Sequence, residues 1–141
     1  MKVVLDTSVL IASFYQPLSG QGFSRQVYDF IIHNEKIYVS EWMMEEFKEK
    51  CRVKLKMSPA QIQKLQSFIL ERAYLIELGR KKFKEYAGLR DKNDAHILDL
   101  CARAGAEILL TWDKDLLVLK KMEGLKILTP REFWDCLSSM E

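Results

Sequence analysis

The sequence VVLDTSVLIASF at residues 3–14 decides the fold that we expect for this chain. Its first three residues are valine and leucine, which is typical of a short buried strand, and Asp6 follows directly. Thr7 and Ser8 are good helix-capping residues, and the apolar run after them predicts a helix. A strand that passes through an acid into a helix is a typical first unit of a parallel α/β sheet.

The same arrangement recurs in ILLTWDKDLL, residues 108–117. Asp113 follows an apolar strand there and precedes two leucines of a short helical pattern. In an open parallel sheet, ligands bind in the crevice outside the carboxyl ends of the strands. Asp6 and Asp113 are therefore candidate ligands of one metal site, although they are far apart in the sequence.

Strand and helix patterns alternate along the rest of the chain. Helical runs separate short apolar strands, which implies right-handed crossovers and a parallel sheet with helices on both faces. We therefore predict an α/β three-layer sandwich with a central parallel sheet of about five short strands. The expected strands are residues 2–5, 37–39, 74–78, 107–111 and 126–128, and the expected helices include 92–103 and 116–121.

Composition favours one compact domain in a reducing compartment. With 141 residues, 48% of them hydrophobic, the chain can bury one core but is short for two domains, so we expect a single domain, 1–141. The net charge of +2 means that affinity for nucleic acid must come from local clusters. Three cysteines without a CxxC pair argue against a disulfide framework, and no signal or membrane-length apolar pattern is found, so we expect a cytoplasmic protein.

Asp94 is the most telling acid in the middle of the chain. Ile97, Leu98 and Cys101 follow it at helical spacing, which places its carboxylate within the apolar stripe of the expected helix. Burying an ionised carboxylate costs several kcal/mol unless a basic side chain, backbone amides or a cation neutralises it. The alternative is that Asp94 only complements the helix dipole, with Asp91 as the N-cap.

The other acids have similar alternatives. Asp113 or Asp115 could cap the short helix that follows, but capping needs one carboxylate, and two neighbouring acids repel each other unless they share a cation. Asp6 could cap the helix that begins near Ser8. Periodicity does not select a further ligand from the next helical run, because it contains four glutamates: Glu41, Glu45, Glu46 and Glu49.

Three segments together resemble the PIN domain, a nuclease family that includes the VapC-type toxins. They are VVLDTSVLIASF, SEWMMEEFKEKC and RDKNDAHILDLCARAGAEILLTWDKDLL, and the resemblance extends over essentially the whole chain. It implies a strand order of 3-2-1-4-5. The family's four acids fall on Asp6, Glu46, Asp94 and Asp113, an additional acid on Asp115, and a Ser or Thr beside the first and last acids on Ser8 and Thr111.

This acid-rich set indicates hard, oxygen-preferring cations, namely Mg²⁺ or Mn²⁺, because His33 and His96 are too few and too separated for a zinc site. The resemblance implies a metal-dependent endoribonuclease that hydrolyses single-stranded RNA to a 5′ phosphate and a 3′ hydroxyl. Glu46 would complete the metal shell or position a second ion. It also implies a toxin restrained by an antitoxin protein, and dimers are frequent among relatives.

Two basic stretches are candidates to contact the RNA phosphates, one from Lys48 to Lys56 and one from Arg80 to Lys84, although both could be ordinary solvated faces. Trp112 is bulkier than the residue usual at that point of the family pattern, and could narrow the groove, stack on a base or simply pack. The alternative function is a PIN-like module that binds RNA or a protein without turnover. A haloacid-dehalogenase phosphatase is disfavoured because Asp6 is followed by Thr7 and Ser8 and not by a DxDxT pattern. A receiver is disfavoured because Glu77 and Leu78 stand where its phosphoacceptor would follow the third strand.

Overall fold

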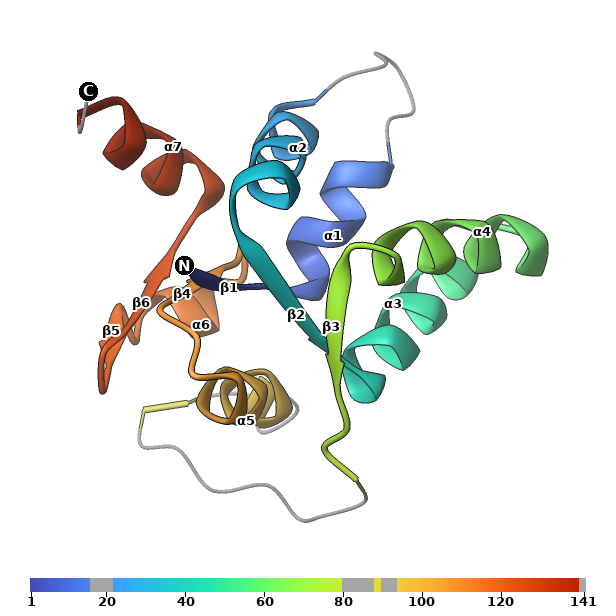
Figure 1. Ribbon diagram of the computed structural model, residues 1–141. Helices are drawn as coiled ribbons and strands as arrows, with labels where there is room; N and C mark the ends of the chain where they lie inside the picture. The colour runs from blue at the N-terminus through green and yellow to red at the C-terminus, as the bar shows by residue number, and fades with distance from the viewer. Residues whose placement is uncertain (16–21, 80–87, 90–93, 140–141) are drawn as a thin grey trace.

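The structure is a computed structural model that describes residues 1–15, 22–79, 88–89 and 94–139 (Figure 1). Its strands are β1 (Lys2–Leu5), β2 (Lys36–Ser40), β3 (Ala73–Ile76), β4 (Ile108–Leu110), β5 (Lys121–Met122) and β6 (Leu125–Leu128). Its helices are α1 (Thr7–Phe14), α2 (Phe23–Asn34), α3 (Glu41–Val53), α4 (Pro59–Leu70), α5 (Ala95–Ala104), α6 (Lys114–Leu117) and α7 (Pro130–Ser139).

The strands form one sheet in the order β3-β2-β1-β4-β6-β5. All neighbouring pairs are parallel except β5 with β6. Because β6 is the fifth strand expected from the sequence, the order 3-2-1-4-5 is confirmed, and β5 is added at one edge. Parallel pairing aligns the carboxyl ends of β1, β2 and β4 at the same edge of the sheet.

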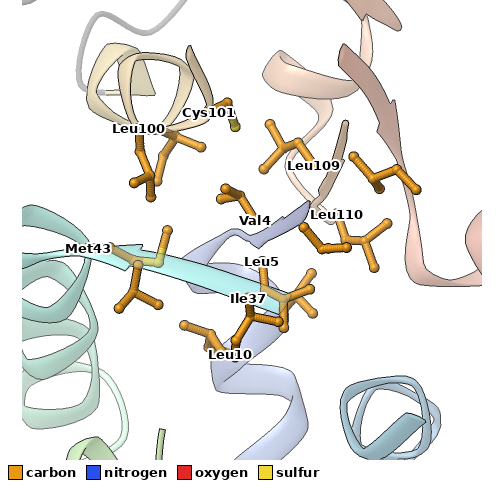
Figure 2. Close-up of a cluster of buried hydrophobic side chains, with 14 of the residues drawn as sticks. Val4, Leu5, Leu10, Ile37, Met43, Leu100, Cys101, Leu109 and Leu110 are labelled. Atoms are coloured by element: carbon orange, nitrogen blue, oxygen red, sulfur yellow. The ribbon is translucent and has the colours of Figure 1, made fainter. Parts of the chain in front are cut away.

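Helices cover both faces of this sheet. In Figure 1, α5 lies on one side, and α1 and α2 lie on the other; α3 packs against α1, and α7 packs against α2 and β6. Successive side chains of β1 point to opposite faces of the sheet: Figure 2 shows Val4 directed towards α5 and Leu5 directed towards the α1 side. Both are fully buried, so the α/β three-layer architecture is confirmed with a core on each face of the sheet.

The predicted helix over 116–121 is wrong in its second half. α6 ends at Leu117, and Lys121–Met122 forms strand β5 antiparallel to β6. The two-residue turn between them, Glu123-Gly124, has φ values of +42° and +87°. Positive φ at both central positions is typical of a hairpin turn that matches strand twist, and glycine at the second position tolerates it. Strand β5 has only two residues, too few to show an alternating pattern in the sequence.

Other boundaries shift by a few residues. The strand expected over 74–78 ends at Ile76, and the helix expected over 92–103 is described as Ala95–Ala104. The basic stretch at 80–86 and Asp91 lie outside the described residues. Within the described ranges, the structure contains no helix long and apolar enough to cross a membrane.

Candidate metal centre

Pairing of β1 with β4 brings two distant segments together at the carboxyl edge of the sheet. Leu5 is in register with Leu110, and the backbone N–H of Asp6 donates to Leu110 O at 2.9 Å, which extends the ladder by one residue. Asp6 and Thr111 therefore leave neighbouring strands at the same level. Thr111 is itself fixed on its other side, where its N–H donates to Leu128 O at 3.0 Å.

The Asp6 carboxylate is buried and held by hydrogen bonds. Thr111 Oγ1 donates to Asp6 Oδ2 at 2.8 Å, Ser8 Oγ donates to the same oxygen at 3.1 Å, and Thr7 N donates to Oδ1 at 2.8 Å. Burial raises the pKa of the Asp6 carboxyl, and the charge of Glu46 raises it further, against the lowering effect of these hydrogen bonds. Asp6 is also the N-cap of α1, so the capping alternative describes part of its role.

Asp113 is attached to the same network through its backbone. Its N–H donates to Thr111 Oγ1 at 2.9 Å, and its Oδ1 accepts from Asp115 N at 2.9 Å. Asp113 is therefore the N-cap of α6, while Asp115 lies in the first turn of that helix. The capping contact uses one oxygen of Asp113. Capping of α6 therefore accounts for Asp113 but gives no reason for a second acid at Asp115.

Asp94 completes a group of three carboxylates. It occupies the N-cap position of α5, yet within the described helix its side chain accepts no capping hydrogen bond. One oxygen from each of Asp94, Asp113 and Asp115 lies within 4.8 Å of the other two, and all three residues are partly buried. Like charges at this spacing repel each other, and a shared divalent cation would relieve that repulsion. Three carboxylates are a fitting donor set for Mg²⁺ or Mn²⁺.

Glu46 approaches the site from the middle of α3. Its Oε2 lies 3.4 Å from His96 Nε2 of α5, and its Oε1 lies 3.9 Å from Lys50 Nζ. Burial alone would raise the pKa of Glu46, but the His96 contact, the nearby Thr7 hydroxyl and the positive charge of Lys50 outweigh it, so the pKa is lowered. The negative charge of Glu46 also acts to raise the pKa of Asp6, so the two carboxylates interact electrostatically.

The acids expected from the sequence thus divide into two adjoining sets. Asp94, Asp113 and Asp115 form the close group, whereas among the described residues Asp6 and Glu46 are not part of it. Ser8 and Thr111, the supporting residues expected from the sequence, both donate hydrogen bonds to the Asp6 carboxylate. Asp91 lies outside the described residues.

Sequence reasoning missed two residues beside Glu46, namely His96, which contacts it, and Thr7, whose hydroxyl influences its pKa. His96 is only 5% exposed and Thr7 is fully buried, and both lie within two residues of an expected ligand. The signal available in the sequence is a polar side chain within two residues of a candidate acid. The sequence pattern indicates His96 only as a possible zinc ligand and Thr7 only as a helix cap.

A model of the PIN domain matches residues 2–115 of the chain, which is most of its length and includes every acid described above. The chain belongs to the PIN domain family. PIN domains are generally nucleases and typically use divalent metals, which agrees with the chemistry of the carboxylate group.

Two solved structures show the same fold. A chain of VapBC2 from Rickettsia felis, solved bound to a DNA fragment from their promoter, matches this PIN domain with a TM-score of 0.61 and 19% sequence identity, covering 90% of this chain and 97% of that one. PAE2754 from Pyrobaculum aerophilum matches with a TM-score of 0.59 and 17% identity, covering 98% and 90%. No curated protein matches this PIN domain in sequence.

Proposed function

We propose that this PIN domain is a metal-dependent endoribonuclease that hydrolyses single-stranded RNA. The observation that carries the proposal is the group of three carboxylates, Asp94, Asp113 and Asp115, with oxygens within 4.8 Å of one another. They stand at the carboxyl edge of a parallel sheet, where ligands of such sheets bind. Thr111 links Asp6 to the Asp113 backbone, and Glu46 contacts His96, two residues after Asp94, so both further carboxylates belong to the same region of the protein.

In this proposal Asp94, Asp113 and Asp115 hold a Mg²⁺ or Mn²⁺ ion, and Asp6 and Glu46 complete the catalytic set. When bound, such an ion lowers the pKa of a coordinated water and stabilises charge on a phosphate. The protein keeps the donors in place: Thr111 links Asp6 to the Asp113 backbone, and the His96 contact directs Glu46.

The proposed reaction is a hydrolysis without a covalent enzyme intermediate. A water oxygen forms a bond to phosphorus while the bond from phosphorus to the 3′ oxygen breaks. The leaving 3′ oxygen takes up a proton, so the products are a 5′ phosphate and a 3′ hydroxyl.

Exposed cations of α3 supply candidate contacts for the RNA backbone. Lys50 is close to Glu46, and Arg52 Nη2 is 2.7 Å from Glu49 Oε1, so these two are partly neutralised. Lys48, Lys54 and Lys56 are exposed on or just after the same helix. Basic side chains near an acidic site let phosphates approach it, and their effect weakens as salt rises.

We further propose that the protein acts as the toxin of a toxin–antitoxin pair in the cytoplasm, as a single domain that can dimerise. The likeness to VapBC2, which was solved bound to a DNA fragment from their promoter, supports the antitoxin partner. Co-expression with the protein encoded by the neighbouring gene tests the toxin–antitoxin proposal. Co-purification and loss of RNA cleavage are expected, whereas unchanged cleavage would contradict the pairing.

RNA cleavage in a metal titration tests the nuclease itself. We expect cleavage of a single-stranded RNA in Mg²⁺ or Mn²⁺, its loss with a chelator, and at least about a 100-fold lower rate in Asp94→Asn. Asp99→Asn is the matched control, because Asp99 lies on the same helix and pairs with Arg103, away from the carboxylate group.

A binding module without turnover is the alternative, and one observation favours it. Asp6 and Glu46 already have hydrogen-bonding partners without any ion, so the fold does not need a metal to satisfy them. RNA binding by the wild type, with no cleavage at any metal concentration above that of Asp94→Asn, would establish this alternative.

A further inference from the structure

Trp42 lies directly beside the acidic site. It is one helical turn before Glu46 on α3, so the two side chains project from the same face of the helix. Both contact the same residue of α5: Glu46 Oε2 is 3.4 Å from His96 Nε2, and the Trp42 and His96 rings are stacked with centroids 6.1 Å apart at 30°. The indole is therefore a neighbour of a carboxylate of the proposed catalytic set.

The orientation of the indole is fixed by a second contact. Trp42 Nε1 donates to Gly79 O at 2.7 Å, and both oxygens of the preceding Glu41 accept from the backbone, from Leu78 N at 2.8 Å and Gly79 N at 3.0 Å. The ring is thus held between α5 and the segment after β3. A ring already fixed in place loses little conformational entropy when a ligand stacks on it.

Despite these contacts, Trp42 remains 39% exposed. It lines an open hollow of about 550 Å³ together with Glu41, Glu45 and Gly79. Two carboxylates at the rim disfavour a phosphate there, whereas an uncharged base meets no such repulsion. The hollow therefore suits a nucleobase rather than the RNA backbone.

We propose that Trp42 is a substrate-binding residue on which a base of the RNA stacks, next to the phosphate held at the acidic site. The inference rests on the proposed function and adds the contact that selects unpaired RNA, because a base is free to stack on a side chain only when it is not paired within a helix. Stacking on an aromatic ring tolerates any base, so Trp42 contributes affinity without sequence preference.

Equilibrium binding of a short labelled RNA tests this role. Fluorescence anisotropy is measured in Ca²⁺, with the intactness of the RNA checked on a gel, for the wild type, Trp42→Leu and Trp42→Phe. A second oligonucleotide of equal length carries ribose phosphates without bases. Tyr15→Leu is the control. Tyr15 is an exposed aromatic residue like Trp42 (45% exposed), but it lies at the opposite end of α1 from Asp6.

We expect Trp42→Leu to bind the base-bearing RNA about 5- to 150-fold more weakly than the wild type, with Trp42→Phe in between and Tyr15→Leu unchanged. The abasic oligonucleotide should bind the wild type and Trp42→Leu equally. RNA should also quench the tryptophan fluorescence of the wild type more than that of Trp42→Phe, which keeps the other two tryptophans.

The proposal is overturned if Trp42→Leu binds RNA like the wild type, or if it weakens both oligonucleotides by the same factor, since that would indicate a general structural effect. If Trp42→Leu does not fold, the binding of the two oligonucleotides by Trp42→Phe and by the wild type is compared instead, with the same criteria. RNA cleavage without any effect of Trp42 on binding would refute only this inference. A Trp42-dependent difference between the two oligonucleotides without cleavage would refute only the nuclease.

Discussion

Thr111 is the residue that connects the two sets of acids. Its hydroxyl donates to Asp6 Oδ2 and accepts from Asp113 N, so one side chain bridges the end of β1 and the start of α6. It is fully buried, and water is therefore a poor substitute for either bond. A residue known from the sequence only as a family position thus sets the geometry of two candidate ligands.

Two substitutions of Thr111 distinguish the contribution of its hydroxyl from that of its shape. Thr111→Val keeps the volume but leaves a buried carboxylate and a backbone N–H each without this bond, so we expect a loss of about 1–3 kcal/mol in the free energy of unfolding. Thr111→Ser keeps the hydroxyl and should lose less, about 1 kcal/mol for the missing methyl. Urea denaturation measures both, and equal losses would contradict the bridging role.

Asp94 offers a second test at the scale of one residue. Its carboxylate lies within 4.8 Å of two others, so Asp94→Asn should relieve repulsion and fold at least as stably as the wild type in a chelator. Asp99→Asn, which loses an ion pair with Arg103, should be unchanged or slightly less stable. A clear fall in melting temperature for Asp94→Asn alone would show that its main role is at the start of α5.

At the scale of elements, the start of α3 is joined to the segment that follows β3. Ser40 caps the helix by accepting from Met43 N at 3.0 Å, and Glu41 accepts from Leu78 N and Gly79 N. Parallel pairing of β2 with β3 brings these segments to the same edge of the sheet. The joint fixes the direction of α3, and with it the approach of Glu46 to the acidic site.

Glu41→Gln tests this joint through pH. Burial acts to raise the pKa of Glu41, but hydrogen bonds from backbone N–H groups outweigh it and the pKa is lowered. A lowered pKa in the folded state means that the stabilisation is present above the unfolded pKa and is lost as pH falls through the folded pKa. The variant should therefore be less stable than the wild type at pH 7, by roughly 1 kcal/mol or less because solvent screens the group, and the difference should shrink towards pH 3.

Urea denaturation of both proteins at several pH values measures the effect. Glu45→Gln serves as the control, since Glu45 is an exposed glutamate on the same helix. A difference between Glu41→Gln and wild type that stays constant across this pH range would exclude a contribution from the ionised Glu41 carboxylate.

At the scale of the whole molecule, the sheet order collects the acids. β1 is central, with β2 on one side and β4 on the other, so the segments that follow these three strands leave from one edge. α5 covers the opposite face from α1 and α2 (Figure 1), and its N-cap residue, Asp94, lies with Asp113 and Asp115 in the carboxylate group. Negative charge gathers there although the formal net charge of the chain is +2.

Metal binding should stabilise the entire fold, because the carboxylate group exists only in the folded chain. At a free Mn²⁺ concentration of about 100 times the Kd, the stabilisation is about 2.7 kcal/mol, which corresponds to a rise of several degrees in melting temperature. A chelator should reverse the rise. Calorimetry should show no rise for the double variant Asp94→Asn, Asp113→Asn, and an unchanged rise for Asp135→Asn on α7, where the acid is exposed. Equal shifts in both variants would place the ion elsewhere.

The sequence by itself determined the layers, the parallel sheet and the segments that carry acids, because strand and helix periodicity and the ends of strands are local properties. The strand order followed only from the resemblance to the PIN domain. It did not reveal the β5–β6 hairpin, whose two-residue strand is too short to form a pattern. Periodicity places Glu46 on a solvated face and cannot show that His96 contacts it. Only the tertiary structure decided which oxygens come within 4.8 Å and which are held by neighbouring groups. Those distances depend on how β1, β4, α3 and α5 pack, and packing joins residues that are up to about a hundred positions apart in the chain.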